Sequence, residues 1–164
     1  MDPFRSLLFV VLLALAVGVP AAHAQSVDLQ PATSSEILDA VAQNEAQVTV
    51  VNMWATWCVP CIEEFPHFMQ LGREFADQGV KVVFVSTDVP SEKDAVTEFL
   101  EEQGVSGRSF LKDEKATPFV TTFHDDWSGA VPATFVYDAD GQLLAFWEGK
   151  MSYADLKQNV TPHL

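Results

Sequence analysis

Basic residues are scarce in this chain. Nine Lys and Arg stand against 23 Asp and Glu over 164 residues, which gives a formal net charge of −14. Nucleic acids and anionic membrane surfaces are bound through clusters of Lys and Arg. We therefore expect no nucleic-acid partner, and we attribute the acidic balance of the chain to solubility.

Cysteine is scarcer still. The only two are Cys58 and Cys61, in the segment NMWATWCVPC. A disulfide between them would close a loop too small to restrict much of the unfolded chain. Stabilisation of the fold is therefore a weak explanation for the pair. A metal site would need further ligands, and the four histidines show no ligand spacing with the two cysteines. The pattern favours chemistry at the cysteines themselves and predicts no metal site.

Long apolar runs are limited to one segment near the N-terminus. It extends from Leu7 to Val19 and is shorter than the about 20 apolar residues that a membrane-spanning helix needs. Ala22 and Ala24 then form the small-x-small pattern of a signal-peptidase site. The run and the cleavage pattern together predict a signal peptide over residues 1–24.

The N-terminal interpretation fixes the domain boundaries. We expect a polar linker over residues 25–32 and one folded domain over residues 33–164. An uncleaved membrane anchor is the alternative to a cleaved signal peptide. Either form places the rest of the chain in an exported compartment, which we take to be the periplasm.

Apolar periodicity predicts alternating helices and strands over the first half of the domain. The expected order is a helix opened by the capping box Thr33–Glu36, a strand over Val48–Trp54, a helix from the cysteines to Gly79, a strand over Val80–Thr87, and a helix capped by Ser91 that stops at Gly104. Both strands are near-continuous apolar runs, which are typical of strands buried on both faces. The β-α-β-α order predicts that the two strands are parallel.

The second half of the chain is expected to close the sheet. Residues 105–130 carry a weak signal, a short helix over Thr117–His124. Strands over Ala133–Tyr137 and Gln142–Glu148 then form a hairpin around the turn DADG. A helix capped by Ser152 ends the chain. The sequence therefore predicts a single α/β domain.

The two cysteines fall at the junction of the first predicted strand and the following helix. Cys58 would face unpaired backbone N–H groups and the positive end of the helix dipole, which stabilise a thiolate and lower its pKa. Cys61 lies one turn further, in place to attack a mixed disulfide formed at Cys58. Pro60 suits the first helical turn because its missing N–H is not needed there. We predict Cys58 as the nucleophile and Cys61 as the resolving cysteine.

The segment VVNMWATWCVPCIEEFP, followed later by GAVPATFVYDADG, resembles exported thiol-disulfide oxidoreductases of the TlpA and ResA type, which are related to cytochrome c maturation proteins. The resemblance covers about residues 33–160. It implies that residues 33–164 form a thioredoxin-like domain, in which a central mixed β-sheet is flanked by helices, here with an N-terminal helical extension.

The resemblance also implies further site residues. Pro132 matches the cis-proline of the family, so the Val131–Pro132 bond is expected to be cis and to help present a substrate backbone beside the cysteines. Glu64 matches the glutamate of the family's C-x-x-E-F-P motif. A carboxylate buried beside a thiol would have a raised pKa and could accept a proton from Cys61. Asn52 departs from classical thioredoxins, which carry an Asp there, and this assigns the role of base to Glu64.

The tryptophans that precede the nucleophile have different expected positions. Trp57 is expected as an exposed rim for docking, and Trp54 as part of the core. We assign substrate contact to Trp57, Pro60, Val131 and Pro132. Trp127 could flank the same groove through the loop that carries Pro132.

The leading hypothesis is a periplasmic protein-disulfide oxidoreductase that cycles Cys58 and Cys61 between dithiol and disulfide without another cofactor. The resemblance favours a monomeric reductant, supplied by a membrane electron donor and acting on exported proteins such as apocytochrome c. A disulfide-donating oxidase stays open, because potentials across CxxC proteins run from about −270 to −120 mV.

Other classes of function remain as alternatives. A copper-binding assembly factor would share the fold, with His124 as its one candidate ligand besides the cysteines, but such proteins typically space their cysteines CxxxC. A peroxidase needs one activated cysteine, which often follows a threonine and a proline, and the segment TWC lacks that proline. A redox-inert binding module has no reason to keep a CxxC at this junction.

Overall fold

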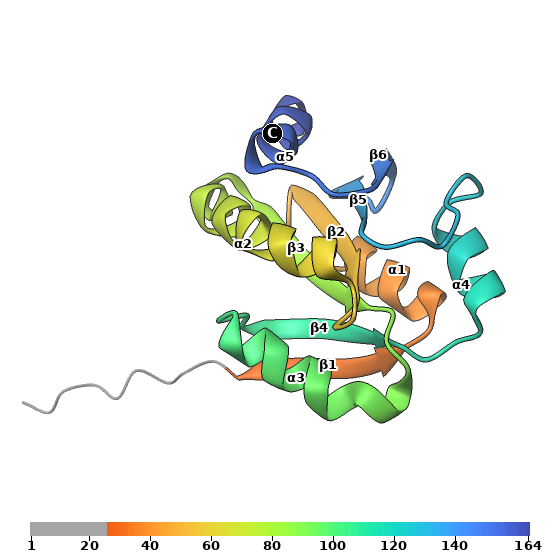
Figure 1. Ribbon diagram of the computed structural model, residues 1–164. Coiled ribbons are helices and arrows are strands. Elements are labelled where there is room, and N and C mark those ends of the chain that lie inside the picture. Colours follow the sequence, from red (N-terminus) through yellow and green to blue (C-terminus); the bar gives the residue numbers. More distant parts are fainter. Residues whose placement is uncertain (1–25) are drawn as a thin grey trace, which may run out of the picture.

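The computed structural model describes residues 26–164 (Figure 1). The predicted signal peptide, residues 1–24, lies outside the described residues. Within residues 26–164, no helix has both the length and the apolar character needed to cross a membrane.

Six strands form one mixed sheet in the order β1-β4-β3-β2-β5-β6. The strands are β1 (Val27–Ala32), β2 (Val48–Trp54), β3 (Val80–Ser86), β4 (Gly107–Lys112), β5 (Ala133–Asp138) and β6 (Leu143–Glu148). The first four in sequence pair in parallel, whereas β5 runs antiparallel to both β2 and β6. All seven residues of β2 are buried, as its near-continuous apolar sequence predicts for a strand in the middle of the sheet.

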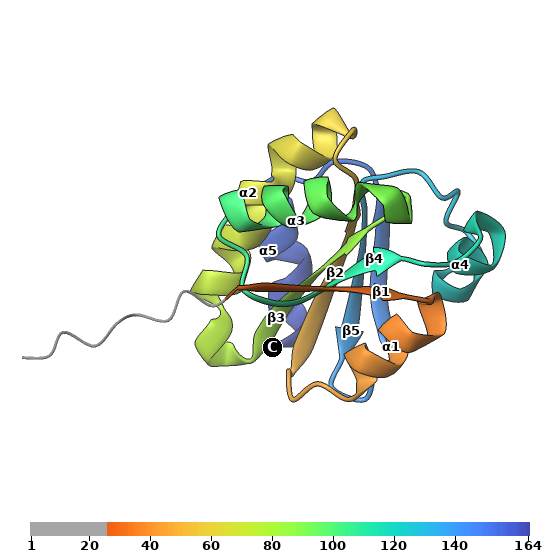
Figure 2. The same ribbon diagram turned by 90° about the horizontal axis from the view of Figure 1, so that it is seen from below.

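Helices cover both faces of this sheet (Figure 2). They are α1 (Ser34–Ala42), α2 (Val59–Glu74), α3 (Lys93–Glu102), α4 (Ala116–Phe123) and α5 (Tyr153–Val160), with 3-10 turns at Ala76–Gln78, Pro90–Glu92 and Thr161–His163. One apolar cluster joins α2, α3 and α5 to the sheet, and a second joins α1 and α4 to its other face. Successive residues of β2 alternate between the two clusters, with Val50 in the first and Val51 in the second. The predicted α/β class with a central mixed sheet is confirmed.

Helix caps set several of the element boundaries. The predicted capping box of α1 is present, since the Thr33 hydroxyl accepts from the Glu36 N–H and the Glu36 carboxylate accepts from the Thr33 N–H. Ser152 caps α5 in the same way. The prediction for Ser91 is wrong, because a 3-10 turn over Pro90–Glu92 precedes α3, whose N-cap, Glu92, makes no side-chain capping bond.

The prediction of a linker over residues 25–32 is also wrong. Residues Val27–Ala32 form β1, an edge strand that pairs in parallel with β4, and the N-terminal extension is therefore a strand followed by a helix. Pro31 is tolerated there because an edge strand has one side without a ladder partner. Neither β1 nor β4 is an apolar run, and their pairing joins segments about half the chain apart, so local periodicity gives little signal for either.

The turn between β5 and β6 packs directly against α1. Gly141 has φ +76°, and an added Cβ would lie 2.7 Å from the Cβ of Ala42 and 3.1 Å from its Cα. Positive φ costs a non-glycine residue roughly 1–2 kcal/mol, and overpacking adds about 1–3 kcal/mol. We expect Gly141→Ala to lower the free energy of unfolding by about 2–5 kcal/mol in urea denaturation.

Gly104 provides the matched control for this substitution. It has a similar φ of +72°, but an added Cβ would meet no atom within 4 Å. Gly104→Ala should therefore lose only the backbone contribution, roughly 1–2 kcal/mol. Equal losses in the two variants would show that the contact with Ala42 adds nothing.

Candidate active site

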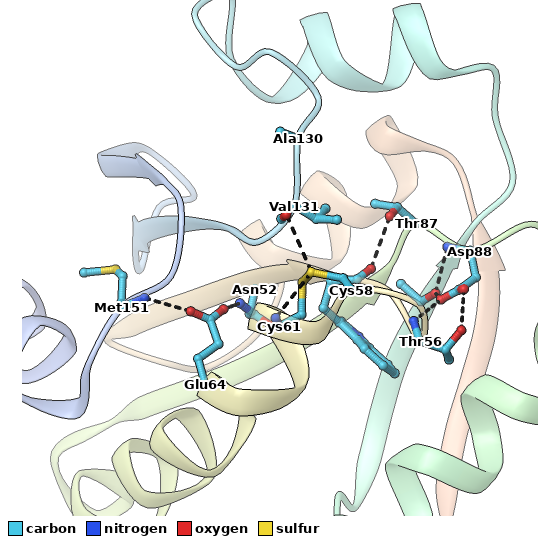
Figure 3. Close-up of a disulfide and its surroundings, with 12 residues drawn as sticks. Asn52, Thr56, Cys58, Cys61, Glu64, Thr87, Asp88, Ala130, Val131 and Met151 are labelled. Carbon is cyan, nitrogen blue, oxygen red and sulfur yellow. Dashed lines mark hydrogen bonds between the residues drawn. A yellow bond between two sulfur atoms is a disulfide. The ribbon is translucent and has the colours of Figure 1, made fainter.

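The two cysteines form a disulfide where β2 leads into α2 (Figure 3). A turn closed by the bond from the Cys58 N–H to the Ala55 carbonyl, 3.1 Å long, brings the chain from the sheet to the helix. Cys58 is the N-cap residue of α2, and Pro60 lies in the first turn, where no N–H is needed. The Cα atoms of Cys58 and Cys61 are 5.3 Å apart.

The environments of the two sulfur atoms differ. The backbone N–H of Cys61 points to the Cys58 Sγ at 3.3 Å, and the dipole of α2 favours negative charge at the same end. Cys58 retains 4% of its exposure and Cys61 none, so an incoming group can reach only Cys58. The geometry stabilises a thiolate at Cys58 and supports its predicted role as the nucleophile.

The loop that precedes β5 lies against the disulfide. The Val131–Pro132 peptide bond is cis, as predicted, and the Val131 carbonyl oxygen lies 3.5 Å from the Cys58 Sγ. Antiparallel pairing places Ala133 opposite Met53, which brings the start of β5 beside the end of β2. The predicted substrate-contact residues Val131 and Pro132 are thus next to the predicted nucleophile.

Trp127 supports this loop from the interior. Its indole N–H donates to the Ala130 carbonyl at 2.9 Å, and its ring packs against Phe123 and Phe135. Trp127 is buried, so it does not line a groove as the sequence suggested. Trp57 is 68% exposed and Trp54 is fully buried, and both predictions of position are confirmed.

Glu64 is a fully buried carboxyl group one turn below the cysteines. Its Oε2 accepts from the Met151 N–H at 2.8 Å, and its Oε1 accepts from the Asn52 side-chain amide at 3.0 Å. Burial raises the pKa of Glu64 to about 7, against the opposing effect of these hydrogen bonds and of Lys150. A carboxyl group with this pKa can take up or release a proton near neutral pH.

The neighbouring Glu63 has the opposite character. It is exposed and forms an ion pair with Lys150. Lys150 and Met151 belong to the loop between β6 and α5, and the carbonyl of Met151 also lies 3.2 Å from the His67 Nδ1. The first turns of α2 are therefore bound to this loop through several contacts. Of the two glutamates, only Glu64 is buried enough for its pKa to be shifted toward neutral pH.

A second buried carboxylate, Asp88, lies on the other side of the disulfide (Figure 3). It follows β3 and binds both the backbone and the side chain of Thr56, two residues before Cys58. Sequence reasoning missed Asp88 and Thr56 because their contact spans 32 residues. One signal was available in the sequence. Asp88 is an acidic residue just after the apolar run of β3, where functional residues often lie.

The histidine considered as a copper ligand lies in different surroundings. The ring of His124 stacks on Phe146 with centroids 4.7 Å apart, and its Nδ1 accepts from the Asp126 N–H. Over residues 26–164, no three His, Cys, Asp or Glu side chains are grouped closely enough to hold a metal ion.

Comparisons with known proteins agree with this geometry. Among curated relatives, the chain is 31% identical to the thiol-disulfide oxidoreductase ResA of Bacillus subtilis over 102 residues, which cover 62% of this chain and 53% of ResA. It is 26% identical to the thiol:disulfide interchange protein HelX of Rhodobacter capsulatus over 92% of this chain and 80% of HelX. The chain thus spans only about half the length of the ResA protein that it matches.

Solved structures show the same fold. A thioredoxin-family thiol:disulfide interchange protein from Chlorobium tepidum superposes with a TM-score of 0.61 at 24% identity, covering 79% of this chain and 83% of that one. StoA from Bacillus subtilis superposes with a TM-score of 0.55 at 25% identity, covering 72% of this chain and 85% of StoA. The predicted thioredoxin fold and the resemblance to proteins of the ResA type are confirmed.

A family model described as AhpC/TSA matches residues 19–146, which is most of the chain. The mixed sheet, the CxxC disulfide at the start of α2 and the cis-proline loop lie within this match or at its boundaries. The chain belongs to the AhpC/TSA family.

Proposed function

We propose that this chain is a thiol-disulfide oxidoreductase that cycles Cys58 and Cys61 between dithiol and disulfide. The observation that carries the proposal is the disulfide itself, which lies at the N-terminus of α2 against the cis-Pro132 loop. The names of ResA and HelX describe the same kind of chemistry in proteins that this chain resembles.

The arrangement supports a two-step exchange. In the dithiol form, the Cys58 thiolate attacks one sulfur of a partner disulfide, forms a mixed disulfide and displaces the other partner sulfur as a thiolate. The Cys61 sulfur then attacks the Cys58 sulfur, which releases the partner as a dithiol and leaves the Cys58–Cys61 disulfide. Two electrons pass to the partner, and the partner thiolates take up the protons.

Glu64 is assigned the proton of Cys61 in this scheme. Cys61 must lose its proton before it can attack, and it has no exposure to solvent. Glu64 follows it by three residues on α2, and its pKa of about 7 lets it accept a proton at neutral pH. Trp57, Pro60, Val131 and Pro132 are assigned the contacts with the partner backbone and side chains.

We further propose the direction and the setting of the reaction. The chain acts as a monomeric reductant of disulfides in exported proteins, with apocytochrome c as a candidate substrate, in the periplasm. A membrane protein with a reduced dithiol returns the two electrons, and no cofactor besides the disulfide takes part. The signal-peptide pattern of residues 1–24 and the relatives of the ResA type support this assignment.

The midpoint potential of the Cys58–Cys61 pair tests the direction. Equilibration in thiol-disulfide buffers, followed by alkylation of the thiols, should give a potential below about −220 mV, as a reductant requires. A potential near about −120 mV would instead assign the role of disulfide donor. Stoichiometric copper(I) binding that survives a competing chelator would support the copper-binding alternative.

A further inference from the structure

The turn that presents Cys58 is bound to the end of β3 by a buried carboxylate. Asp88 is 2% exposed, and it makes no ion pair within residues 26–164. A buried carboxylate without a counterion is stabilised only by hydrogen bonds, and such groups are costly to keep. The hydrogen-bond partners of Asp88 therefore indicate the structural role of this buried group.

Both oxygens of Asp88 are used on the turn before the disulfide. Oδ2 accepts from the Thr56 N–H at 3.0 Å and from the Ser86 hydroxyl at 2.7 Å. Oδ1 accepts from the Thr56 hydroxyl at 2.7 Å. Two of these contacts bind Thr56 and the third binds Ser86, the last residue of β3, so Asp88 joins the turn before the disulfide to the end of β3.

A neighbouring contact adds to this attachment. The N–H of Thr87 donates to the Trp54 carbonyl at 2.8 Å, just beyond the last paired residues of β2 and β3. The segment from Trp54 to Thr56 is thus held along its length by consecutive residues of the β3–α3 loop. Its position relative to that loop is set by hydrogen bonds.

An exposed apolar residue follows each of the two hydrogen-bonded residues, Thr56 and Asp88. Trp57 follows Thr56, and Val89 follows Asp88, with exposures of 68% and 55%. Together with Val59, at 66%, they are the most exposed large apolar side chains in the described part of the chain. The contact between Thr56 and Asp88 brings together the two segments that carry Trp57 and Val89. Exposed apolar side chains beside a reactive centre are typical of a docking surface.

We propose that Asp88 is a positioning residue that holds Trp57 and Val89 in one docking surface beside Cys58, for a polypeptide with an apolar side chain next to its reactive cysteine. This inference rests on the proposed function. Asp88 does not touch the reacting sulfur atoms in this scheme, and it acts through Thr56.

The test compares Asp88→Ala with the wild-type full domain in the reduction of two disulfide-linked peptides, one with leucine and one with serine beside the cysteine. We expect the wild type to prefer the leucine peptide. Asp88→Ala should lose about 10- to 100-fold in kcat/KM for that peptide, mostly through KM, because a small displacement of a positioning group has effects of this size. Its preference for leucine over serine should disappear.

Three further variants separate positioning from charge and from general stability. Asn at position 88 can still accept from the Thr56 N–H and donate to the Thr56 hydroxyl, so Asp88→Asn should recover at least about half of the wild-type kcat/KM. Glu114→Ala removes the same kind of paired contact at Ser34, to its N–H and its hydroxyl, and should keep the leucine preference. Thr56→Val removes only the contact of the Thr56 hydroxyl with Asp88. It should cause a smaller loss of kcat/KM for the leucine peptide, and it replaces Asp88→Ala if that variant does not fold.

The outcomes distinguish the inference from the proposed function. Iodoacetamide needs no docking surface, so its rate with reduced Cys58 should change less than about threefold in Asp88→Ala. An active wild type with an unchanged leucine preference in Asp88→Ala and Thr56→Val would overturn the inference alone. Parallel losses in alkylation and peptide reduction, or equal losses in Glu114→Ala, would also overturn it. A wild type that reduces neither peptide would overturn the proposed function and this inference with it.

Discussion

Replacing Cys58 with serine is expected to abolish disulfide reduction, with a loss of at least about a thousandfold in rate, as for the removal of other catalytic nucleophiles. Cys58 is the only sulfur of the pair that a partner can reach, and the N–H of Cys61 and the dipole of α2 stabilise its thiolate. The measurement is the initial rate of reduction of a disulfide-bonded protein in the presence of a thiol donor.

Replacing Cys61 with serine should give a different defect. The first attack by Cys58 remains, but the mixed disulfide cannot be resolved within the chain. A covalent complex with the partner should then accumulate on a non-reducing gel and disappear when a thiol is added. If Cys58→Ser formed this complex instead, the assignment of the two cysteines would be reversed.

Replacing Glu64 with glutamine is expected to slow exchange at pH 7 by about 100-fold, the usual order for the loss of a proton acceptor. Glutamine has nearly the same shape, and it can accept from the Met151 N–H and donate to the Asn52 Oδ1 once the Asn52 amide turns over. It cannot take the proton of Cys61. The dependence of the wild-type rate on pH should rise through about pH 7, where Glu64 ionises, and this rise should be absent in the variant. Rates measured from pH 5 to pH 9 would show the difference.

Glu63→Gln is the matched control for this experiment. Glu63 is adjacent in sequence, exposed and paired with Lys150, so its loss removes one carboxylate without changing the buried one. We expect its pH profile to follow the wild type. Identical thiol titrations and pH profiles in wild type and Glu64→Gln would exclude the role of Glu64.

The same residue links stability to pH. The folded chain keeps the Glu64 proton up to about pH 7, whereas an unfolded chain releases it near the ordinary value of 4.5. Folding therefore takes up a proton between these values, and this contribution to stability is present at low pH and lost as the pH rises through about 7. The loss is at most roughly 3 kcal/mol, and Glu64→Gln should lack it in denaturation at pH 5 and pH 8.

The parts of the fold that follow from the sequence are those with a local pattern. The apolar run of β2 and the capping box at Thr33 are such patterns, because burial on both faces and helix capping each need particular residues in consecutive positions. β1 has no such pattern. It contains Asp28 and Pro31, and it becomes a strand because β4, some 80 residues further on, provides its partner.

The site divides in the same way. The cysteines and Pro132 belong to motifs, so their positions could be predicted before the structure was known. The burial of Glu64 depends on Met151, 87 residues further along the chain, and no local sequence shows such a contact. Asp88 was missed for the same reason, since its importance depends on Thr56, a distant residue that the fold brings next to it.

The loop between β6 and α5 contributes to the site through its main chain. The Gly149 N–H donates to the Pro132 carbonyl at 2.8 Å, and the Met151 N–H donates to Glu64. Two N–H groups of this loop, two residues apart in sequence, therefore bind the cis-proline and the buried carboxyl group. An insertion or deletion of a single residue there would break that spacing whichever amino acid it involved, so loop length at this point is under tighter constraint than amino-acid identity.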